Sequence, residues 1–123
     1  MLKREARALD DAFRALADPT RRAIVERLCD GPRSVSDLAA PLPMSLAGVH
    51  QHLQVLARAG LMAWDKRGRV RWCRLEAKGL RAAEKWILAR RRTWELRLDA
   101  LAAHLEDEEG KEKHSDERSR RRS

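Results

Sequence analysis

Two histidines flank a glutamine at His50, Gln51 and His52, within the stretch MSLAGVHQHLQVLARAGL of residues 44–61. Imidazole nitrogens bind transition metals, and a glutamine amide can hydrogen-bond the edge of an adenine base. Residues two apart on a helix project about 200° from each other, so these histidines cannot share one metal ion. Their spacing therefore favours packing or contact with DNA over metal binding, and we expect no cofactor.

The two cysteines, Cys29 and Cys73, lie far apart and indicate no disulfide framework. Small buried thiols are the simpler interpretation, and a redox pair is the alternative. The charged N-terminus lacks the apolar segment of a secretory signal, and no run approaches the roughly 18 apolar residues of a membrane span. We therefore expect a cytoplasmic protein that does not enter a membrane.

The elements that position these residues are mostly helices. Asp18 is suited to cap a second helix and Pro19 to its first position, with Gly31 and the following proline ending it. A short third helix is expected in SVSDLAA, capped by Ser34 or Ser36, before the prolines of APLPM. The first helix carries apolar residues at helical spacing: Ala6, Leu9, Phe13 and Leu16.

Ser45 is suited to cap a fourth helix, which holds the histidines and ends near Gly60. At about 100° per residue, one stripe of this helix must face the core. That stripe consists of Leu46, Val49, Leu53 and Leu56. The opposite face is small or polar and carries no acid: Ala47, Gln51, Gln54 and Arg58, with Gly48 at its margin.

The segment LMAWDKRGRVRWCRL predicts two strands about a turn at Gly68. Trp64 and Trp72 both lie four residues from Gly68, which predicts that they face each other across the hairpin. We expect them to pack the hairpin, with stacking on DNA bases as the alternative. Basic residues gather at its tip: Lys66, Arg67, Arg69 and Arg71.

From about residue 78 to 106 the pattern becomes helical again. Some 29 residues give a helix of roughly 43 Å, which exceeds the width of a domain this size. Its apolar residues form one stripe: Leu80, Ala83, Ile87, Trp94, Leu98, Leu101 and Leu105. Part of this stripe therefore needs a second chain to cover it. Residues 106–123 contain no apolar side chain and are predicted to form a disordered charged tail.

Charge is concentrated in the part predicted to fold. The 27 basic and 19 acidic residues give a net charge of +8. Residues 106–123 hold 6 basic and 7 acidic residues, which leaves 21 basic and 12 acidic residues, a net of +9, before them. A basic globular domain suggests a polyanionic partner, most often a nucleic acid.

The order of elements, a helix pair with a tight turn and then a basic hairpin, predicts a mainly α winged helix-turn-helix fold. In this arrangement the second helix of the pair enters the major groove and the hairpin reaches the backbone or minor groove. Ala47 and Gly48 allow close approach to base edges, and Gln51 can read one. Ser45, Gln54 and the basic residues of the hairpin suit phosphate contacts.

Three segments, FRALADPTRRAIVERL, LPMSLAGVHQHLQVLARAGL and KRGRVRWCRL, resemble the ArsR family of bacterial winged-helix repressors. The resemblance spans Leu9 to Leu105 and implies a winged helix-turn-helix domain over 9–105 after a flexible 1–8. It also implies a homodimer that binds a near-palindromic operator in double-stranded DNA. His52 matches a histidine that is common in the recognition helix of this family, whereas His50 and Gly48 depart from its usual residues, and both histidines are expected to contact the DNA edge or to pack. The implied dimer contacts are Leu9, Phe13, Leu16, Ile87, Trp94, Leu98, Leu101 and Leu105.

The segment AAEKWILARRRTWELRLDAL is similar to the branch of this family that often lacks metal-site motifs. Metal sensors of this family bind the ion with a cysteine pair near the helix-turn-helix or with carboxylates and histidines of the last helix. Cys29 has no second thiol beside it, and His104 with Asp107 or Glu108 supplies only half of such a last-helix metal site. Two alternatives stay open: a winged-helix protein-interaction module without operator binding, and a repressor that responds to thiol oxidation. No nucleophile motif, phosphate loop or carboxylate pair indicates an enzyme.

Overall fold

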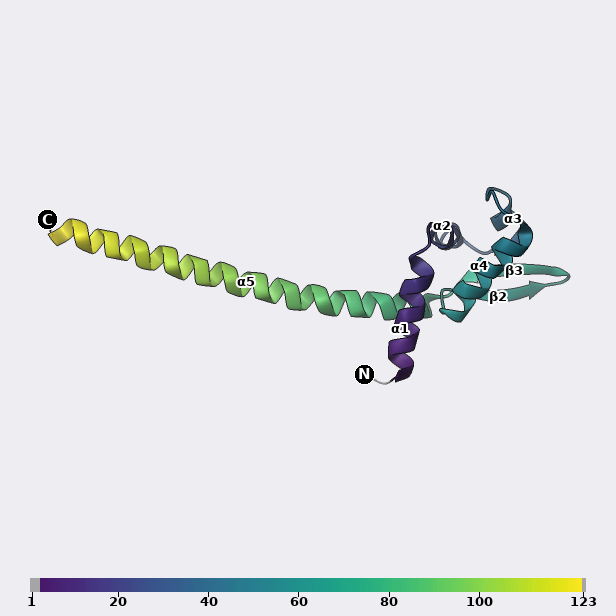
Figure 1. Cartoon of the computed structure of the whole chain (residues 1–123), viewed down its shortest axis with the longest axis horizontal. Helices are drawn as coiled ribbons and strands as arrows, with labels where there is room; N and C mark the ends of the chain where they lie inside the picture. The colour runs from purple at the N-terminus through teal and green to yellow at the C-terminus, as the bar shows by residue number, and fades with distance from the viewer. Residues whose placement is uncertain (1–2, 123) are drawn as a thin grey trace. The chain divides into compact units, whose positions relative to one another are not determined.

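The computed structural model describes the backbone of residues 3–122 and the side chains of residues 3–112. Residues 1, 2 and 123, at the ends of the predicted flexible N-terminus and tail, lie outside the described residues. The elements in chain order are α1 (Lys3–Leu16), α2 (Pro19–Leu28), β1 (Arg33–Ser34), α3 (Val35–Ala39), α4 (Leu46–Arg58), β2 (Met62–Arg67), β3 (Val70–Leu75) and α5 (Ala77–Arg122) (Figure 1).

The chain divides into two compact units. The first, Met1–Lys85, holds α1 to α4, the three strands and the beginning of α5. The second, Trp86–Ser123, holds the rest of α5. The expected fold class, mainly helical with a small antiparallel sheet, is confirmed in the first unit.

Side-chain caps begin three of the helices where the sequence predicts them. The Asp18 carboxylate accepts a hydrogen bond of 3.0 Å from the Arg21 backbone N–H at the start of α2. Ser34 caps α3, and the Ser45 hydroxyl accepts from the Gly48 N–H at 3.1 Å to begin α4. These bonds satisfy backbone donors that have no partner within their own helix.

The helix α4 ends at Gly60, which has a φ of +69°. Glycine adopts this left-handed conformation without the steric penalty that a β-carbon would cause. The Leu61 N–H donates to the Leu56 carbonyl and the Gly60 N–H to the Ala57 carbonyl, which is the Schellman pattern. The Gly79 N–H then donates to the Gly60 carbonyl at 2.8 Å. The start of α5 therefore lies directly against the end of α4.

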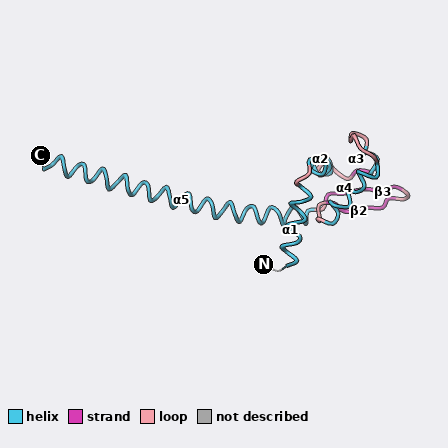
Figure 2. The backbone as a smooth tube through the Cα atoms, viewed as in Figure 1, coloured by secondary structure: helices cyan, strands magenta, loops and turns pink. Residues whose placement is uncertain are grey.

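The sheet has the order β1-β3-β2, and Figure 2 shows the β2–β3 hairpin closing in a short loop. Arg67 pairs with Val70, so the two-residue turn is Gly68 and Arg69, with φ +63° at Gly68. A positive φ at the first turn residue alone is typical of a type II′ turn. The two-residue strand β1, which pairs Arg33 with Cys73, was not predicted.

This register shows that the predicted pairing of the two tryptophans is wrong. Trp64 pairs with Cys73 and Trp72 pairs with Asp65, so the tryptophans lie on opposite faces of the hairpin. The cause is the turn, whose centre falls between Gly68 and Arg69 instead of on Gly68. A register shift of one residue moves every side chain to the other face.

The core of the first unit packs against the inward face of α4. Val49, Leu53 and Leu56 have no exposed side-chain surface, as the helical periodicity predicts. They pack with residues of the other elements: Ile24, Leu28, Leu38, Leu61, Met62 and Cys73. Leu46 was predicted to join this stripe, but it is 60% exposed. It is the first residue of α4, and helix side chains tilt toward the N-terminus, so Leu46 points past the end of the core.

Both ends of the chain are more helical than the sequence predicts. α1 begins at Lys3, inside the segment expected to be flexible, and α5 continues to Arg122 through the segment expected to be disordered. Beyond Leu105 the sequence has no proline and is rich in Glu, Lys and Arg, which favour a helix even without a core to pack on. His104 and Glu108 form an i,i+4 pair at 3.1 Å across the start of this segment.

Candidate nucleic-acid interface

The outer face of α4 is exposed and carries no acid. Its core stripe is buried, and this orientation turns the predicted DNA-facing residues outward: Ala47, Gln51, Gln54 and Arg58 are all exposed. Gly48 lies at the margin of this face, and a β-carbon built there would meet the Ser45 hydroxyl and Met44. The structure therefore brings the small and polar residues of α4 together on one surface.

The hairpin Met62–Leu75, which we call the wing, presents exposed basic side chains at its tip: Lys66, Arg67, Arg69 and Arg71. Lys66 and Arg71 are direct cross-strand partners. Like charges opposite each other in a sheet repel, and a bound polyanion would relieve that repulsion. The one acid of the wing strands, Asp65, lies 3.8 Å from the Arg74 guanidinium.

Aromatic rings support two of these cations. The Arg71 guanidinium lies 4.7 Å from the ring centre of Trp64, and that of Arg67 lies 4.8 Å from the ring centre of Trp72. Such cation–π contacts hold a guanidinium in place without neutralising its charge. The wing thus presents positioned positive charge on both of its faces.

The two histidines of α4 lie on different sides of the helix. The His50 ring packs against Trp64 of β2, with ring centres 5.5 Å apart. His52 points the other way, and its Nδ1 lies 3.4 Å from a guanidinium nitrogen of Arg21 on α2. Both side chains are half-buried. Within the part of the chain that the structure describes, no group of three His, Cys, Asp or Glu residues is placed to hold a metal ion.

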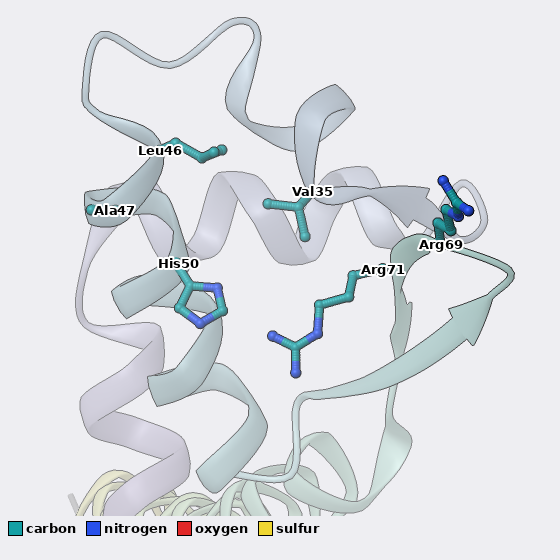
Figure 3. Close-up of a pocket in the computed structure, with 6 residues that line it drawn as sticks. All are labelled: Val35, Leu46, Ala47, His50, Arg69 and Arg71. Carbon is teal, nitrogen blue, oxygen red and sulfur yellow. The ribbon is translucent and has the colours of Figure 1, made fainter.

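A hollow lies between α4, the start of α3 and the wing (Figure 3). We call it the wing-side hollow, and its lining residues are Val35, Leu46, Ala47, His50, Arg69 and Arg71. The side chains of His50 and Arg71 extend toward each other across it from α4 and β3. It borders the outer face of α4 on the side of the wing.

A sequence profile described as a helix-turn-helix domain matches residues 16–63, which include α2, α3 and α4. The HTH-type transcriptional regulator Rv2034 of Mycobacterium tuberculosis is 50% identical over 76 residues, covering 62% of this chain and 71% of that protein. A crystal structure of an ArsR family transcriptional regulator, 41% identical, superposes with a TM-score of 0.69 over 73% of this chain and 93% of that one.

The chain belongs to the ArsR family of winged helix-turn-helix transcriptional regulators.

A further relative is the transcriptional repressor SdpR of Bacillus subtilis strain 168. It is 28% identical over 80 residues, covering 65% of this chain and 89% of that protein. The resemblance seen in the three sequence segments is thereby confirmed. Among the described residues of this ArsR family chain, no helix combines the length and apolar character that crossing a membrane requires.

Sequence reasoning missed the contacts of Arg21. Its guanidinium donates to the Ala15 carbonyl at 2.8 Å and to the Arg14 carbonyl at 2.9 Å, and it also approaches His52. Arg21 therefore joins the end of α1, α2 and α4, the helix with the candidate DNA face. An arginine in the first turn of a helix carries no periodic signal, so the sequence alone did not distinguish it from its neighbour Arg22.

The two thiols of this ArsR family chain lie in different environments. Cys73 is buried on β3, as predicted for a small packing residue, whereas Cys29 at the end of α2 is exposed. Burial raises the pKa of the Cys73 thiol to about 11, despite the opposing charge of Arg71. Both cysteines are free of disulfide bonds.

The predicted dimer contacts are exposed to different degrees. In the first unit, Leu9, Phe13 and Leu16 are half-buried, while the fully buried residues of α1 are Ala12 and Ala15. In the second unit, the apolar residues of α5 are exposed, with Trp94 at 62%. The others in this stripe are Ile87, Leu98, Leu101 and Leu105.

Proposed function

We propose that this chain represses transcription by binding operator DNA as a homodimer, with α4 in the major groove and the wing on the backbone or minor groove. The observation that carries the proposal is the acid-free, exposed outer face of α4 beside the exposed basic side chains at the tip of the wing. The names of its relatives, a transcriptional regulator and a transcriptional repressor, support the same function.

Different groups of this surface supply affinity and sequence choice. Gln51 lies at the centre of the outer face, where its amide can form two hydrogen bonds to an adenine. Lys66, Arg67, Arg69 and Arg71 carry full charges suited to phosphates, which give affinity and register but little sequence choice. Ser45 and Gln54 suit phosphate contacts at the edges of the same face. His52 is half-buried beside Arg21, so we now assign it to packing.

The exposed stripe on α5 supports the homodimer. Trp94, Leu98 and Leu101 are each about half exposed or more, and covering them with a second copy removes a large apolar area from water. A molar mass of twice 14.1 kDa in solution is the expected result of light scattering after gel filtration. Trp94→Glu should give monomers, whereas Leu96→Glu, 61% exposed but about 200° away around the helix, should remain dimeric.

Binding to DNA is tested by fluorescence anisotropy with the duplex that the protein selects from a random pool and with a scrambled duplex, across a salt series. We expect tight binding to the selected duplex that weakens steeply with salt, because phosphate contacts release counterions. Gln51→Ala should abolish the preference between the duplexes. Arg69→Ala should weaken both alike and reduce the salt slope by about one.

Arg81→Ala is the matched control, because Arg81 is also exposed and belongs to the same compact unit but lies on α5. It should leave both affinities and the salt slope close to those of the wild type. Equal, weak binding to both duplexes at every salt concentration would contradict operator binding and favour a protein-interaction module.

A further inference from the structure

The first residue of α4 is an exposed leucine at the border of the candidate DNA face. Leu46 is 60% exposed, whereas Val49 and Leu53, further along the same helix, have no exposed surface. Burying a leucine side chain is favourable, so the isolated chain leaves most of this stabilisation unrealised at Leu46. A ligand that covers Leu46 would recover this apolar contact.

Leu46 opens into the wing-side hollow (Figure 3). Val35, Leu46 and Ala47 make one part of the lining apolar, and Arg69 and Arg71 supply positive charge from the wing. None of the six described residues that line the hollow is acidic. An occupant that fits this lining therefore has a small apolar group next to a negative charge.

The walls of the hollow are held by contacts outside it. Trp64 packs against the His50 ring at 5.5 Å and lies beneath the Arg71 guanidinium at 4.7 Å. One tryptophan of β2 therefore positions both the α4 wall and the β3 wall. The spacing between helix and wing is thus set before any ligand binds.

We propose that Leu46 is a specificity-determining residue that recognises thymine by contact with its 5-methyl group, while Arg69 and Arg71 hold a phosphate of the same DNA strand. This inference rests on the proposed function. The thymine methyl is the apolar group that base pairs present in the major groove, and residues at the N-terminal end of a recognition helix reach base edges. Thymine next to its own strand's phosphate supplies both features that the hollow requires.

The test replaces each thymine of the selected duplex, one at a time, with deoxyuridine, which removes only the methyl group. For the wild-type chain we expect about fourfold weaker binding at one thymine of each half-site, the effect of losing one buried methyl contact. For Leu46→Ala we expect weaker binding to the thymine duplex and no further loss with deoxyuridine. Leu46→Met should keep the discrimination, since it keeps an apolar side chain of similar size.

Leu96→Ala is the matched control, because Leu96 is 61% exposed on α5 and lies outside the hollow. It should respond to deoxyuridine as the wild type does. Preferential binding of the selected duplex with no effect of deoxyuridine at any position, or the same effect in Leu46→Ala, would overturn this inference and leave the proposed function intact. A selected site without thymine would also overturn this inference and leave the proposed function intact. Binding without any sequence preference would overturn both the inference and the proposed function.

Discussion

The ring of His50 on α4 lies 5.5 Å from the ring of Trp64 on β2, with 34° between the ring planes. The same tryptophan carries the Arg71 guanidinium of β3 on its ring at 4.7 Å. This contact joins the helix with the candidate base-reading face to the wing, whose charges we propose to contact phosphates. A two-stranded hairpin alone is marginally stable, so such a contact contributes to the position of the wing.

Replacing His50 by alanine should lower the free energy of unfolding by about 1 kcal/mol, because the ring contact with Trp64 is lost. His50→Phe should keep most of this stability. Urea unfolding followed by tryptophan fluorescence measures the change. Gln54→Ala, on the exposed face of the same helix, should stay within about 0.5 kcal/mol of the wild type. Equal stability of the two alanine variants would show that the ring contact contributes nothing.

Gly79→Ala should destabilise the first unit by roughly 1–3 kcal/mol, because a β-carbon there would overlap the Ala59 carbonyl oxygen and touch Leu61. The backbone of Gly60, which accepts the Gly79 hydrogen bond, cannot move away without breaking the end of α4. The measurement is again urea unfolding.

Gly110→Ala is the matched control in the same helix, since a β-carbon at Gly110 meets no atom within 4 Å. Alanine favours a helix over glycine by up to about 1 kcal/mol, so this variant should show equal or greater helical circular dichroism. A Gly79→Ala protein as stable as the wild type would disprove the close approach of α5 to α4.

Stability should fall in acid partly through Asp18. The hydrogen bond from the Arg21 backbone N–H lowers the pKa of the Asp18 carboxyl below its usual value. A lowered pKa in the folded state means that this stability is present above the pKa of the unfolded chain, about 3.9, and is lost as the pH falls through the folded value.

Asp18→Asn keeps a capping side chain but cannot titrate. As the pH falls from about 5 to about 2, the wild type should therefore lose stability relative to this variant. Asp18→Ala should cost about 1 kcal/mol at pH 7. Urea unfolding over this pH range measures both effects. A pH-independent difference between wild type and Asp18→Asn would contradict the lowered pKa.

Only one of the two thiols should react readily in the folded chain. Cys29 is exposed, whereas burial raises the pKa of Cys73 to about 11 and leaves its reactive thiolate scarce at pH 7. Ellman's reagent should therefore label Cys29 rapidly and Cys73 only on unfolding. Cys29→Ser should abolish the fast reaction and Cys73→Ala should retain it. Fast labelling of both thiols in the native protein would revive the redox alternative.

Local signals in the sequence were sufficient to predict the helices of the first unit and the wing hairpin, but not the ends of α1 and α5 or the register of the wing. The capping bonds of Asp18 and Ser45 and the bond from the Gly60 N–H to the Ala57 carbonyl each join residues three positions apart, so these roles follow from short-range chemistry. The inward stripe of α4 followed from the helical period alone, because Val49 and Leu53 lie on consecutive turns. The outward face, with Gln51 at its centre, followed from the same period.

Tertiary contacts account for the rest. β1 has two residues and exists only because it pairs with β3. Two residues are too few for a periodic pattern in the sequence to predict a strand. The exposure of Leu46 depends on where the core ends, and the His50–Trp64 contact depends on a hairpin register that a single turn residue sets. Arg21 reaches carbonyls six and seven residues away.

Operator recognition through α4 is tested most directly by hydroxyl-radical footprinting on the duplex that the protein selects. We expect two protected half-sites in an inverted repeat, with centres about 10 base pairs or a multiple of this apart, as two copies of α4 require. Gln51→Ala should lose this pattern while Arg81→Ala keeps it. A selected pool without an inverted repeat, or uniform protection that Gln51→Ala leaves unchanged, would show that α4 does not recognise an operator in this way.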